Sequence, residues 1–481
     1  MDPCPLQTLA RNAGGELRGP APARLVERVG TDSRAIRPGD LFVCLHGPNF
    51  DGHRFAAGAV AAGAVGVLGE AGSLDSELVC PQIVVRDARV ALGRMAAAHR
   101  QQFSIPVVAV AGSNGKTTTK ELVAAVLGRR FATVASEASF NNDVGLPQTL
   151  LGLDARAQAA VVEVGTNHPG ELAALLRIAQ PTHGVLTRLG REHLEFFGSL
   201  DGVIQEEGTL ADAIPAEGAL VLIGDSPGAE RVRRRARARV ARVGWAPEND
   251  WVALSASVGD EGTDFAVRAP LAAFNGDYRL RLLGRHQVEN ALLALALGAE
   301  LGLSRAEVEA GLRDCPAPKR RLQLALVGGV RVLDDSYNAN ADSMLAALAT
   351  LRDLDCEGRH IAVLGDMAEL GPHAAAAHVE VGRAAGRLGV DCLYAVGEHA
   401  AELQAGAEAA GLTTTHAFGE ATAAAEALLA EVRPGDLVLV KASRRTRLDL
   451  VADLLKRVLA AQTASGGAVR FPAAHKPCST I

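Results

Sequence analysis

The sequence predicts an α/β protein of two to four domains built on mostly parallel sheets. Short apolar runs rich in valine recur along the chain, and most are followed by a polar cluster and a segment with helical spacing. Such alternation is typical of parallel sheets, whose strands are buried on both faces. With 481 residues, of which 48% are hydrophobic and 22% charged, the chain is long enough for several hydrophobic cores.

The first predicted unit, residues 1–104, is a small α/β domain. Strands are expected over 41–45 and 82–85, and a helix over about 90–102. The loop Thr31-Asp32-Ser33-Arg34 could grip a diphosphate or a sugar through its arginine. It could equally be an ordinary surface turn, and the residues themselves leave both interpretations open.

The central unit, predicted over 105–317, opens with a strand, a glycine-rich turn and a helix. The strand is Val107–Val110, the turn reads Gly112-Ser113-Asn114-Gly115-Lys116-Thr117-Thr118, and helical spacing follows from Lys120. In this context the turn predicts a phosphate-binding loop, because its backbone N–H groups and the helix N-terminus can surround an anion. Lys116 would then meet the β- and γ-phosphates, and the hydroxyl of Thr117 would ligate Mg²⁺. The first glycine of a complete Walker A motif would fall at position 110, which is valine. The flanking elements nevertheless predict a nucleoside triphosphate site.

A buried carboxylate follows in the next strand, predicted over 159–165. Glu163 lies near the carboxyl end of this apolar run, where ligands collect in parallel sheets. A carboxylate there is costly unless it is paired or ligating, so we interpret it as a Mg²⁺ ligand. The alternative is a chance carboxylate at the edge of the sheet. His193, which follows the strand over 183–187, would by itself more often be structural than functional.

The last unit is predicted over 318–461, where the strand and helix pattern restarts. Three apolar strands each end in a polar cluster, and these clusters together look like one side of a ligand cleft. The clusters are Asp334-Asp335-Ser336-Tyr337-Asn338-Ala339-Asn340, Gly365-Asp366-Met367-Ala368-Glu369-Leu370-Gly371 and Lys441-Ala442-Ser443-Arg444. Residues 462–481 are predicted to be a disordered tail.

Composition excludes several classes of protein. A net charge of −6 argues against a general nucleic-acid binder, and the arginine-rich cluster 231–239 is interpreted as a solvated helix face. We expect no secretory signal and no membrane insertion, because the N-terminus lacks an apolar core and the longest apolar run is short. The seven cysteines are scattered without a C-x2-C pair, which favours reduced thiols and a cytoplasmic protein.

With these clusters assembled, the chain resembles the Mur ligase family of peptidoglycan synthesis from about residue 30 to residue 457. The GSNGKTT segment is shared with folylpolyglutamate synthetase, whereas DDSYNAN with GDMAELG indicates the branch that adds D-alanyl-D-alanine. The other segments that carry the resemblance are TDSR with FDGH, FNNDVGLP, VEVGTNHPGE, HLEFFGS, GRH with Asn290, and KASR.

The resemblance implies a three-domain architecture: a UDP-sugar-binding domain over 1–104, a central phosphate-loop ATP domain with a mostly parallel sheet over 105–317, and a Rossmann-like C-terminal ligase domain over 318–461. The implied reaction uses ATP and Mg²⁺. The carboxylate of a UDP-N-acetylmuramoyl-tripeptide becomes an acyl phosphate, and the amine of D-alanyl-D-alanine attacks it, which gives a pentapeptide, ADP and phosphate. We expect a monomer with small-molecule substrates.

Several roles follow from the resemblance alone. Thr117 and Glu163 would hold Mg²⁺, with His193 at a second cation position, and Lys116 would screen the reacting anions. Asn290 would contact adenine, while Arg321 and Asp335 would contact phosphates and ribose. The remaining residues would bind substrate: Ser33, Arg34, Asn141, Asn142, Thr166, Asn167 and His168 along the path of the UDP-linked peptide, with Tyr337, Asn338, Lys441, Ser443 and Arg444 in the C-terminal domain.

The sequence also departs from the family pattern. Gln287 replaces an asparagine, Ala341 replaces a frequent proline, and Lys319-Arg320-Arg321 replaces Pro-Gly-Arg, so the hinge between the last two domains is expected to differ. The most informative departure is Glu207, which stands where the family usually has a lysine whose carbamate faces the second Mg²⁺. We hypothesise that Glu207 is a genetically encoded carboxylate in place of that carbamate. The alternative is that the second-metal arrangement is weakened in this chain.

Three rival functions remain open at this point. The nearest is another ATP-dependent amide ligase, either a different Mur step or folylpolyglutamate synthetase. A nucleotide switch is disfavoured for GTP, because the chain has no N-K-x-D motif. A catalytically dead, ligase-like binding module is supported only by the missing lysine.

Overall fold

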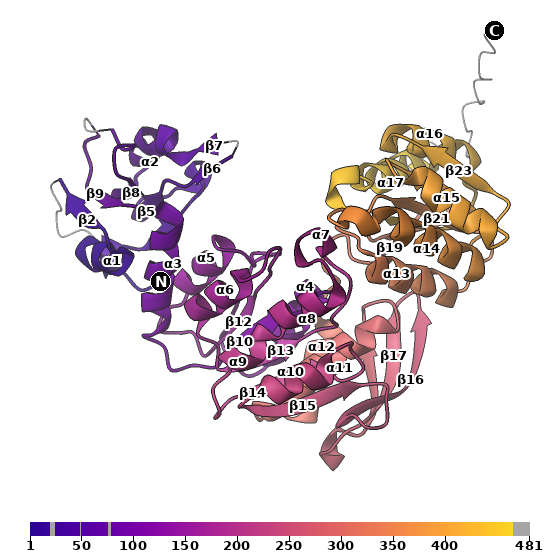
Figure 1. The fold of residues 1–481 in the computed structure, drawn as a ribbon, viewed down its shortest axis with the longest axis horizontal. Coiled ribbons are helices and arrows are strands. Elements are labelled where there is room, and N and C mark those ends of the chain that lie inside the picture. Colours follow the sequence, from indigo (N-terminus) through magenta and orange to yellow (C-terminus); the bar gives the residue numbers. More distant parts are fainter. Residues whose placement is uncertain (20–24, 49, 76–77, 465–481) are drawn as a thin grey trace, which may run out of the picture.

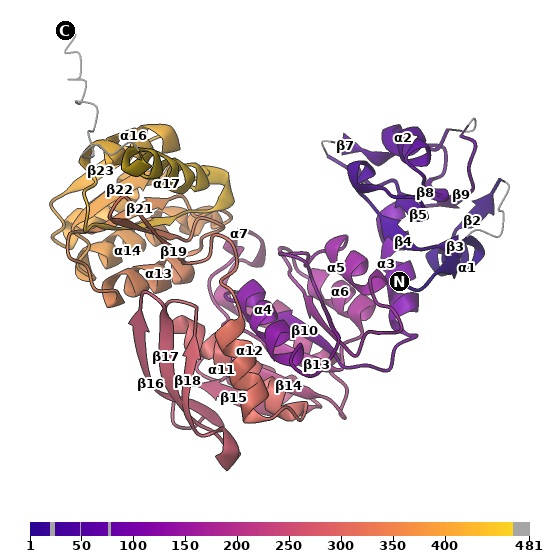
Figure 2. The ribbon, with the colours of Figure 1, turned by 180° about the vertical axis from the view of Figure 1, so that it is seen from behind.

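The computed structural model describes residues 1–19, 25–48, 50–75 and 78–464, which form a V-shaped molecule with three main sheets (Figures 1 and 2). These sheets have five, nine and six strands in chain order, and we call the parts built on them the N-terminal, central and C-terminal units. The central unit forms the base of the V, and the other two units form its arms.

The N-terminal unit is built on a five-stranded sheet of order β2-β9-β8-β5-β4, in which β2 alone is antiparallel. The strands predicted over 41–45 and 82–85 are β5 and β9. The unit comprises β1 (Cys4–Pro5), α1 (Leu6–Ala13), β2 (Glu16–Arg18), β3 (Leu25–Val26), β4 (Arg28–Gly30), η1 (Ser33–Ala35), β5 (Asp40–Val43), β6 (His46–Gly47), β7 (Phe50–Asp51), η2 (Gly52–Phe55), α2 (Ala56–Ala61), β8 (Gly66–Glu70), β9 (Gln82–Val85) and α3 (Ala88–Arg100).

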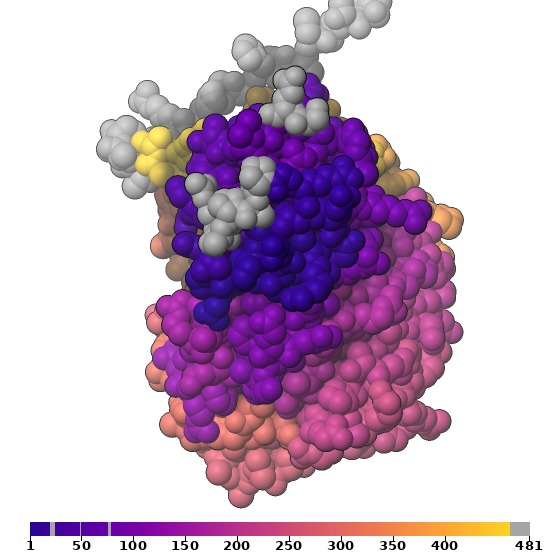
Figure 3. All heavy atoms as spheres, turned by 90° about the vertical axis from the view of Figure 1, so that its left-hand side faces the viewer, coloured from indigo at the N-terminus to yellow at the C-terminus, as the bar shows by residue number. Residues whose placement is uncertain are grey.

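Helix α3 attaches this unit to the central one. Its buried side chains Leu92 and Met95 belong to the same hydrophobic core as Leu146 and Leu150 of the central unit. In Figure 3, which faces the N-terminal side of the molecule, the two units lie directly against each other. The apolar contact therefore holds the first arm of the V in place.

The central sheet has the order β11-β12-β10-β13-β14-β15-β16-β17-β18. Strands β10 to β16 pair in parallel, and β16, β17 and β18 form an antiparallel extension. The elements are β10 (Val107–Ala111), α4 (Lys116–Leu127), β11 (Thr133–Ala135), α5 (Gly145–Leu151), β12 (Ala159–Glu163), α6 (Glu171–Ala179), β13 (His183–Leu186), α7 (Leu194–Phe197), α8 (Leu200–Glu207), α9 (Thr209–Ala213), β14 (Ala219–Ile223), α10 (Ala229–Arg235), β15 (Arg239–Gly244), β16 (Trp251–Gly259), β17 (Gly262–Arg268), η3 (Ala272–Phe274), β18 (Gly276–Leu280), α11 (His286–Glu300) and α12 (Arg305–Asp314).

Helices cover both faces of this sheet and create a switch point beside β10. Helices α4, α11 and α12 pack on one face, and α5, α6 and α9 pack on the other. Strand β10 lies between β12 and β13, and the helices that follow β10 and β12 are on opposite faces. Ligands of open α/β sheets bind in the crevice at such a point, so the phosphate loop after β10 is well placed.

The C-terminal sheet has the order β19-β20-β24-β21-β22-β23, with β19 antiparallel to β20 and the other pairs parallel. Strands β20, β24 and β21 are neighbours, so the three predicted polar clusters do follow adjacent strand ends. The elements are β19 (Gln323–Val327), β20 (Val330–Asp334), α13 (Ala341–Asp353), β21 (His360–Gly365), η4 (Gly371–His373), α14 (Ala374–Arg387), β22 (Cys392–Val396), α15 (Ala400–Ala409), β23 (Thr415–Phe418), α16 (Ala421–Glu431), β24 (Leu437–Lys441), η5 (Arg444–Thr446) and α17 (Asp449–Ala464).

Helix α17 corrects the prediction for the end of the chain. Residues 462–464 belong to this helix and not to a disordered tail, whereas residues 465–481 lie outside the described residues. Across the described ranges, no helix is long and apolar enough to cross a membrane. The cysteines within those ranges are all unbridged, in agreement with the expected reduced thiols.

The central and C-terminal units share apolar contacts through the short helix α7. Its residues Leu194 and Phe197 are buried in one hydrophobic cluster with Met367 and Leu370 of the C-terminal unit. The segment between β13 and α7 therefore runs from the phosphate loop to the second arm of the V.

Candidate active site

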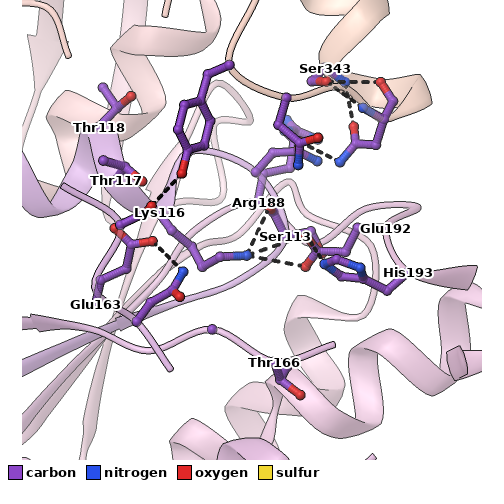
Figure 4. Close-up of a pocket in the computed structure, with 18 of the residues that line it drawn as sticks. Ser113, Lys116, Thr117, Thr118, Glu163, Thr166, Arg188, Glu192, His193 and Ser343 are labelled. Carbon is purple, nitrogen blue, oxygen red and sulfur yellow. Dashed lines mark hydrogen bonds and ion pairs between the residues drawn. The ribbon is translucent and has the colours of Figure 1, made fainter. Parts of the chain in front are cut away.

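A cavity of about 800 Å³ lies where the phosphate loop faces the C-terminal unit (Figure 4). Most of the predicted site residues line it: Ser113, Asn114, Gly115, Lys116, Thr117, Thr118, Asn141, Asn142, Glu163, Thr166, Asn167, His193, Asn290, Arg321, Asp335, Tyr337, Asn338 and Lys441. The predicted residues that do not line it are Ser33, Arg34, Gly112, His168, Glu207, Ser443 and Arg444.

The phosphate loop requires glycine at two positions. Gly112 and Gly115 have φ angles of 114° and 92°, which lie in the left-handed region. A Cβ atom at Gly115 would also lie 2.5 Å from Oδ1 of Asn290, which packs against the loop from α11. The loop thus leads directly into α4, which begins at Lys116 with its N-terminus at the cavity.

The side chain of Lys116 extends along the cavity wall toward Glu192 (Figure 4). Its ammonium donates to the carbonyl oxygens of Gly112 and Ser113 and lies 3.4 and 3.5 Å from the two carboxylate oxygens of Glu192. Burial works to lower the pKa of Lys116, but the surrounding carboxylates, Glu192 before Glu207 and Glu163, raise it above its ordinary value. The lysine therefore stays charged.

Two buried carboxylate oxygens near this ammonium have no hydrogen-bond partner among the described residues, Oε2 of Glu163 and Oε1 of Glu207. The other oxygen of Glu163 accepts from Nδ2 of Asn141 at 2.9 Å, and that of Glu207 accepts from the N–H of Gly112 at 2.7 Å. Burial raises the pKa of Glu207 above its ordinary value, although the Lys116 ammonium opposes this shift. The single ammonium of Lys116 faces the carboxyl groups of Glu192, Glu207 and Glu163, so a further cation would improve the charge balance of the site.

The residues present therefore fit Mg²⁺, although not as a single cluster of the predicted ligands. Nowhere in the described part of the chain do three His, Cys, Asp or Glu side chains group closely enough to hold a metal. The ring of His193 is bonded through Nδ1 to Glu369, and the hydroxyl of Thr117 accepts from Arg321 at 3.0 Å. Mg²⁺ is commonly held by one or two carboxylates, with water and phosphate completing its shell, so Glu163 beside the loop is a suitable ligand.

The C-terminal unit contributes an ion pair and an aromatic bridge to the cavity. Lys441 at the end of β24 lies 2.7 Å from Oδ2 of Asp335 and donates to the carbonyl of Asn338 at 2.8 Å. Burial raises the pKa of Asp335, while Lys441 works against that shift. The guanidinium of Arg321 stacks over the ring of Tyr337, whose hydroxyl is bonded to Ser139 of the central unit.

The loop Thr166–Gly170 forms the wall below Lys116. Glu206 accepts hydrogen bonds from the N–H groups of Gly170 and Leu172 at 2.8 and 2.9 Å and from the hydroxyl of Thr166 at 3.3 Å. Thr166 and Asn167 consequently border the cavity, whereas the ring of His168 packs on Phe196 outside it.

The remaining predicted residues lie elsewhere. Arg34 is exposed and pairs with Asp32 in the N-terminal unit. Ser443 is buried at the start of η5 and its hydroxyl has no hydrogen-bond partner in the described ranges, while Arg444 is exposed.

Sequence reasoning missed several residues that the structure brings to the cavity. Glu192 was not singled out, because it lies one residue before the HLEFFGS segment that carries the resemblance. His286 is also half-buried in the cavity wall, and its pKa is lowered to about 4 by desolvation and by the cations Lys441 and Arg188. No sequence pattern predicts these contacts, since the partners are far apart in the chain.

Three family profiles match the chain in order: the Mur ligase family catalytic domain over residues 25–100, the Mur ligase middle domain over 110–298, and the Mur ligase glutamate ligase domain over 320–444. With a loop, sheet and cavity of this kind and full-length relatives above 30% identity, the chain belongs to the Mur ligase family.

Among its relatives are proteins named UDP-N-acetylmuramoyl-tripeptide–D-alanyl-D-alanine ligase. The one from Escherichia coli K12 is 36% identical and the match covers 94% of this chain and 98% of that protein. The one from Mycobacterium tuberculosis H37Rv is 39% identical, with 90% and 92% covered.

Solved structures of the same kind are similar over nearly the whole chain. A crystal structure of MurF from Acinetobacter baumannii has a TM-score of 0.87 at 30% identity, with 95% of this chain and 99% of that chain covered. A MurF ligase from Thermotoga maritima in complex with ADP has a TM-score of 0.79 at 26% identity, with 90% and 98% covered.

Proposed function

We propose that this chain is an ATP-dependent ligase that adds D-alanyl-D-alanine to a UDP-N-acetylmuramoyl-tripeptide. The observation that supports this most is the cavity in which the phosphate loop faces Asp335, Tyr337 and Lys441 of the C-terminal unit. The relatives named for this reaction match this chain along most of its length, and the Thermotoga maritima structure carries ADP.

The reaction proceeds in two steps. A carboxylate oxygen of the tripeptide attacks the γ-phosphorus of ATP, and ADP leaves with the bond electrons. The amino nitrogen of the dipeptide then attacks the acyl carbon and loses its proton, and phosphate leaves with the former carboxylate oxygen. Both steps bring anions or a polar amine together, so positioning and charge screening supply most of the catalysis.

The residues of the cavity have distinct tasks in this proposal. The N–H groups of the phosphate loop and the start of α4 bind the β- and γ-phosphates, with Lys116 as the positive charge beside them. Arg321 and Asp335 contact the nucleotide from the C-terminal unit, and Asn290 contacts the base. Lys441, which is paired with Asp335, would orient the incoming dipeptide. Tyr337, Asn338, Ser443 and Arg444 would also contribute to binding it.

The donor lies between the N-terminal and central units in this proposal. Its UDP-sugar end would contact Ser33 and Arg34, and its peptide would pass Asn141, Asn142, Thr166, Asn167 and His168. In this proposal the donor, nucleotide and ligase domains are residues 1–104, 105–317 and 318–464, the last of them extended from 461 to the end of α17.

Mg²⁺ would be held by Thr117 and Glu163, with His193 and Glu207 toward a second ion. Bound there, it would neutralise charge on the phosphates and on the attacking carboxylate. Thr117 and His193 would first have to exchange their present partners, Arg321 and Glu369.

Glu207 provides a sharp test of this arrangement. If the carboxylate of Glu207 takes the place of the carbamate, Glu207→Gln should lower Mg²⁺-dependent turnover by about tenfold or more. Loss of a group that supports a metal site typically has an effect in this range. Added bicarbonate should neither stimulate the wild type nor restore the variant. The measurement is phosphate release at saturating ATP, with exposed Glu217→Gln as the control that should keep wild-type turnover. An unchanged rate in Glu207→Gln, or bicarbonate stimulation traced to a lysine, would contradict the hypothesis.

Product analysis tests the function itself. With a UDP-muramoyl-tripeptide donor, D-alanyl-D-alanine should trigger phosphate release and amide formation, whereas D-glutamate and diaminopimelate should not. Folate with glutamate tests the folylpolyglutamate synthetase alternative. ATP hydrolysis that ignores both donor and acceptor, or no turnover with any acceptor, would refute the proposal.

A further inference from the structure

The segment Arg188–His193 connects the phosphate loop to the C-terminal unit. The carbonyl of Arg188 accepts from the N–H groups of Ser113 and Asn114 at 3.1 and 3.0 Å, and the hydroxyl of Ser113 accepts from the N–H of Gly190 at 2.9 Å. The beginning of this segment therefore moves with the phosphate loop.

Both neighbours of Glu192 are held by the C-terminal unit. Arg191 donates to Oδ1 of Asp342 at 2.8 Å and to Oε2 of Glu380 at 2.7 Å. His193 is bonded to Glu369 through its ring, and Glu369 also accepts from the backbone N–H of Glu195 at 3.0 Å. The backbone of Glu192 is thus fixed from both sides.

The side chain of Glu192 is directed at Lys116 and not at solvent. It is 8% exposed, and both of its oxygens lie within 3.5 Å of the lysine ammonium. The other contacts of that ammonium are the carbonyls of Gly112 and Ser113. A phosphate that binds in the loop must therefore compete with Glu192 for the positive charge of Lys116.

We propose that Glu192 is a positioning residue that holds Lys116 against the phosphate loop until the phosphates of a nucleotide displace it. This inference rests on the proposed nucleotide site. It assigns Glu192 a role in setting nucleotide affinity through Lys116. Because Arg191 and His193 are anchored on the C-terminal unit, the strength of this hold depends on the position of that unit.

Equilibrium binding of ADP without Mg²⁺ tests the proposal, since no chemistry and no metal are involved. In excess EDTA, Glu192→Gln should lower the Kd of ADP by about fivefold or more, because Lys116 then meets the phosphates without a competing carboxylate. The same substitution in a Lys116→Met background should lose most of this gain, because the lysine through which Glu192 acts is missing.

Two controls make the outcome decisive. Glu195→Gln removes the same charge from an exposed position three residues on and should leave the Kd unchanged. The Tm of Glu192→Gln should match that of the wild type, which shows that a change in the Kd of ADP does not come from misfolding. An unchanged or raised Kd in Glu192→Gln overturns the proposal, as does a gain of equal size in the Lys116→Met background, since Glu192 would then act on the phosphates directly.

The result also separates this inference from the proposed function. Suppose that the wild type binds ADP and the variants change its Kd as predicted, but the wild type makes no D-alanyl-D-alanine adduct. The role of Glu192 is then supported, and the substrate assignment is refuted. A wild type that binds no ADP refutes both.

Discussion

Individual buried carboxylates in this protein differ in how completely they are paired. Glu163 and Glu207 each keep one buried oxygen without a partner in the described ranges, which is costly unless a cation compensates. Asp436 is equally buried, but it is fully paired. Its Oδ2 accepts from the guanidinium of Arg359 at 2.8 Å and from the backbone N–H of Arg433 at 2.9 Å, and its Oδ1 accepts from the backbone N–H of Arg359 at 3.0 Å.

The pairing of Asp436 leads to a prediction about stability and pH. Burial would raise the pKa of Asp436, but Arg359 and the backbone donors hold it below its ordinary value. A carboxyl whose folded pKa is depressed stabilises the fold above its unfolded pKa and loses this contribution as the pH falls through the folded pKa. We expect Asp436→Asn to destabilise the C-terminal unit by about 2–3 kcal/mol at pH 7, since it leaves the partner charge uncompensated.

Thermal unfolding between pH 7 and pH 3 measures this effect. The difference in Tm between wild type and Asp436→Asn should become smaller as the pH falls below the ordinary pKa of an aspartate, about 4. Asp355→Asn, which removes an exposed carboxylate of the same unit, should change Tm little at any pH. A difference that stays constant down to pH 3 would show that the charge of Asp436 is not what stabilises the unit.

Among the elements, helix α8 holds two loops of the site with two consecutive residues. Successive positions on a helix point about 100° apart, so Glu206 and Glu207 can face different neighbours. Glu206 reaches the N-terminus of α6 and the loop Thr166–Gly170, while Glu207 reaches the N–H of Gly112. This short helix therefore sets the distance between the phosphate loop and the proposed donor-binding loop.

We predict that Glu206→Gln raises the KM for the UDP-linked donor and leaves the KM for ATP near the wild-type value. The amide of glutamine has one acceptor oxygen where the carboxylate has two, so the loop Thr166–Gly170 loses part of its hydrogen bonding to α8. We expect a cost of about 1 kcal/mol, which corresponds to about fivefold in KM. Steady-state kinetics with each substrate varied in turn measures the effect. Exposed Glu248→Gln serves as the control, and an equal change in both KM values would argue for a general loss of structure instead.

The sequence predicts the elements better than it predicts their ends. Strand β9 matches its prediction, and β10 is one residue longer, because short valine-rich runs bounded by turns determine these strands locally. Helix α4 begins at Lys116, earlier than its apolar spacing suggests, because Gly115 in the left-handed region directs the chain straight into the first turn. The linker before β19 contains Arg320 and Leu322 at φ angles of 58° and 50°, a geometry that no residue in the segment Lys319-Arg320-Arg321 indicates.

At the scale of the whole molecule, contacts of Arg191 hold the C-terminal unit on the central one. The guanidinium is shared by Asp342 on α13 and Glu380 on α14, and all three side chains are only partly exposed. Further contacts across the same junction join Arg321 to Thr117 and Asn340 to Asn114 at 2.9 Å. The orientation of the second arm in Figure 1 therefore depends on polar contacts as well as on α7.

We predict that Arg191→Gln shifts the molecule toward more open arrangements in the absence of nucleotide. Partly exposed ion pairs contribute on the order of 1 kcal/mol each, so the loss of two, about 2 kcal/mol, changes the balance between closed and open forms by up to roughly thirtyfold. Small-angle X-ray scattering should report a larger radius of gyration for the variant. Arg352→Gln, an arginine that pairs only with its neighbour Asp353 among the described contacts, should scatter like the wild type. Equal radii for Arg191→Gln and wild type would show that the pairs do not restrain the unit.

Local sequence determined the strands, the phosphate loop and the polar clusters at the strand ends, because each depends on residues close together in the chain. Fold class and family resemblance followed from those segments taken in order. Tertiary structure alone decided that Glu192 faces Lys116, that Glu206 and Glu207 hold separate loops, and that Arg191 reaches the C-terminal unit. These contacts join residues from 34 to 189 positions apart, and only the packing of the sheets and units brings such partners within hydrogen-bonding distance.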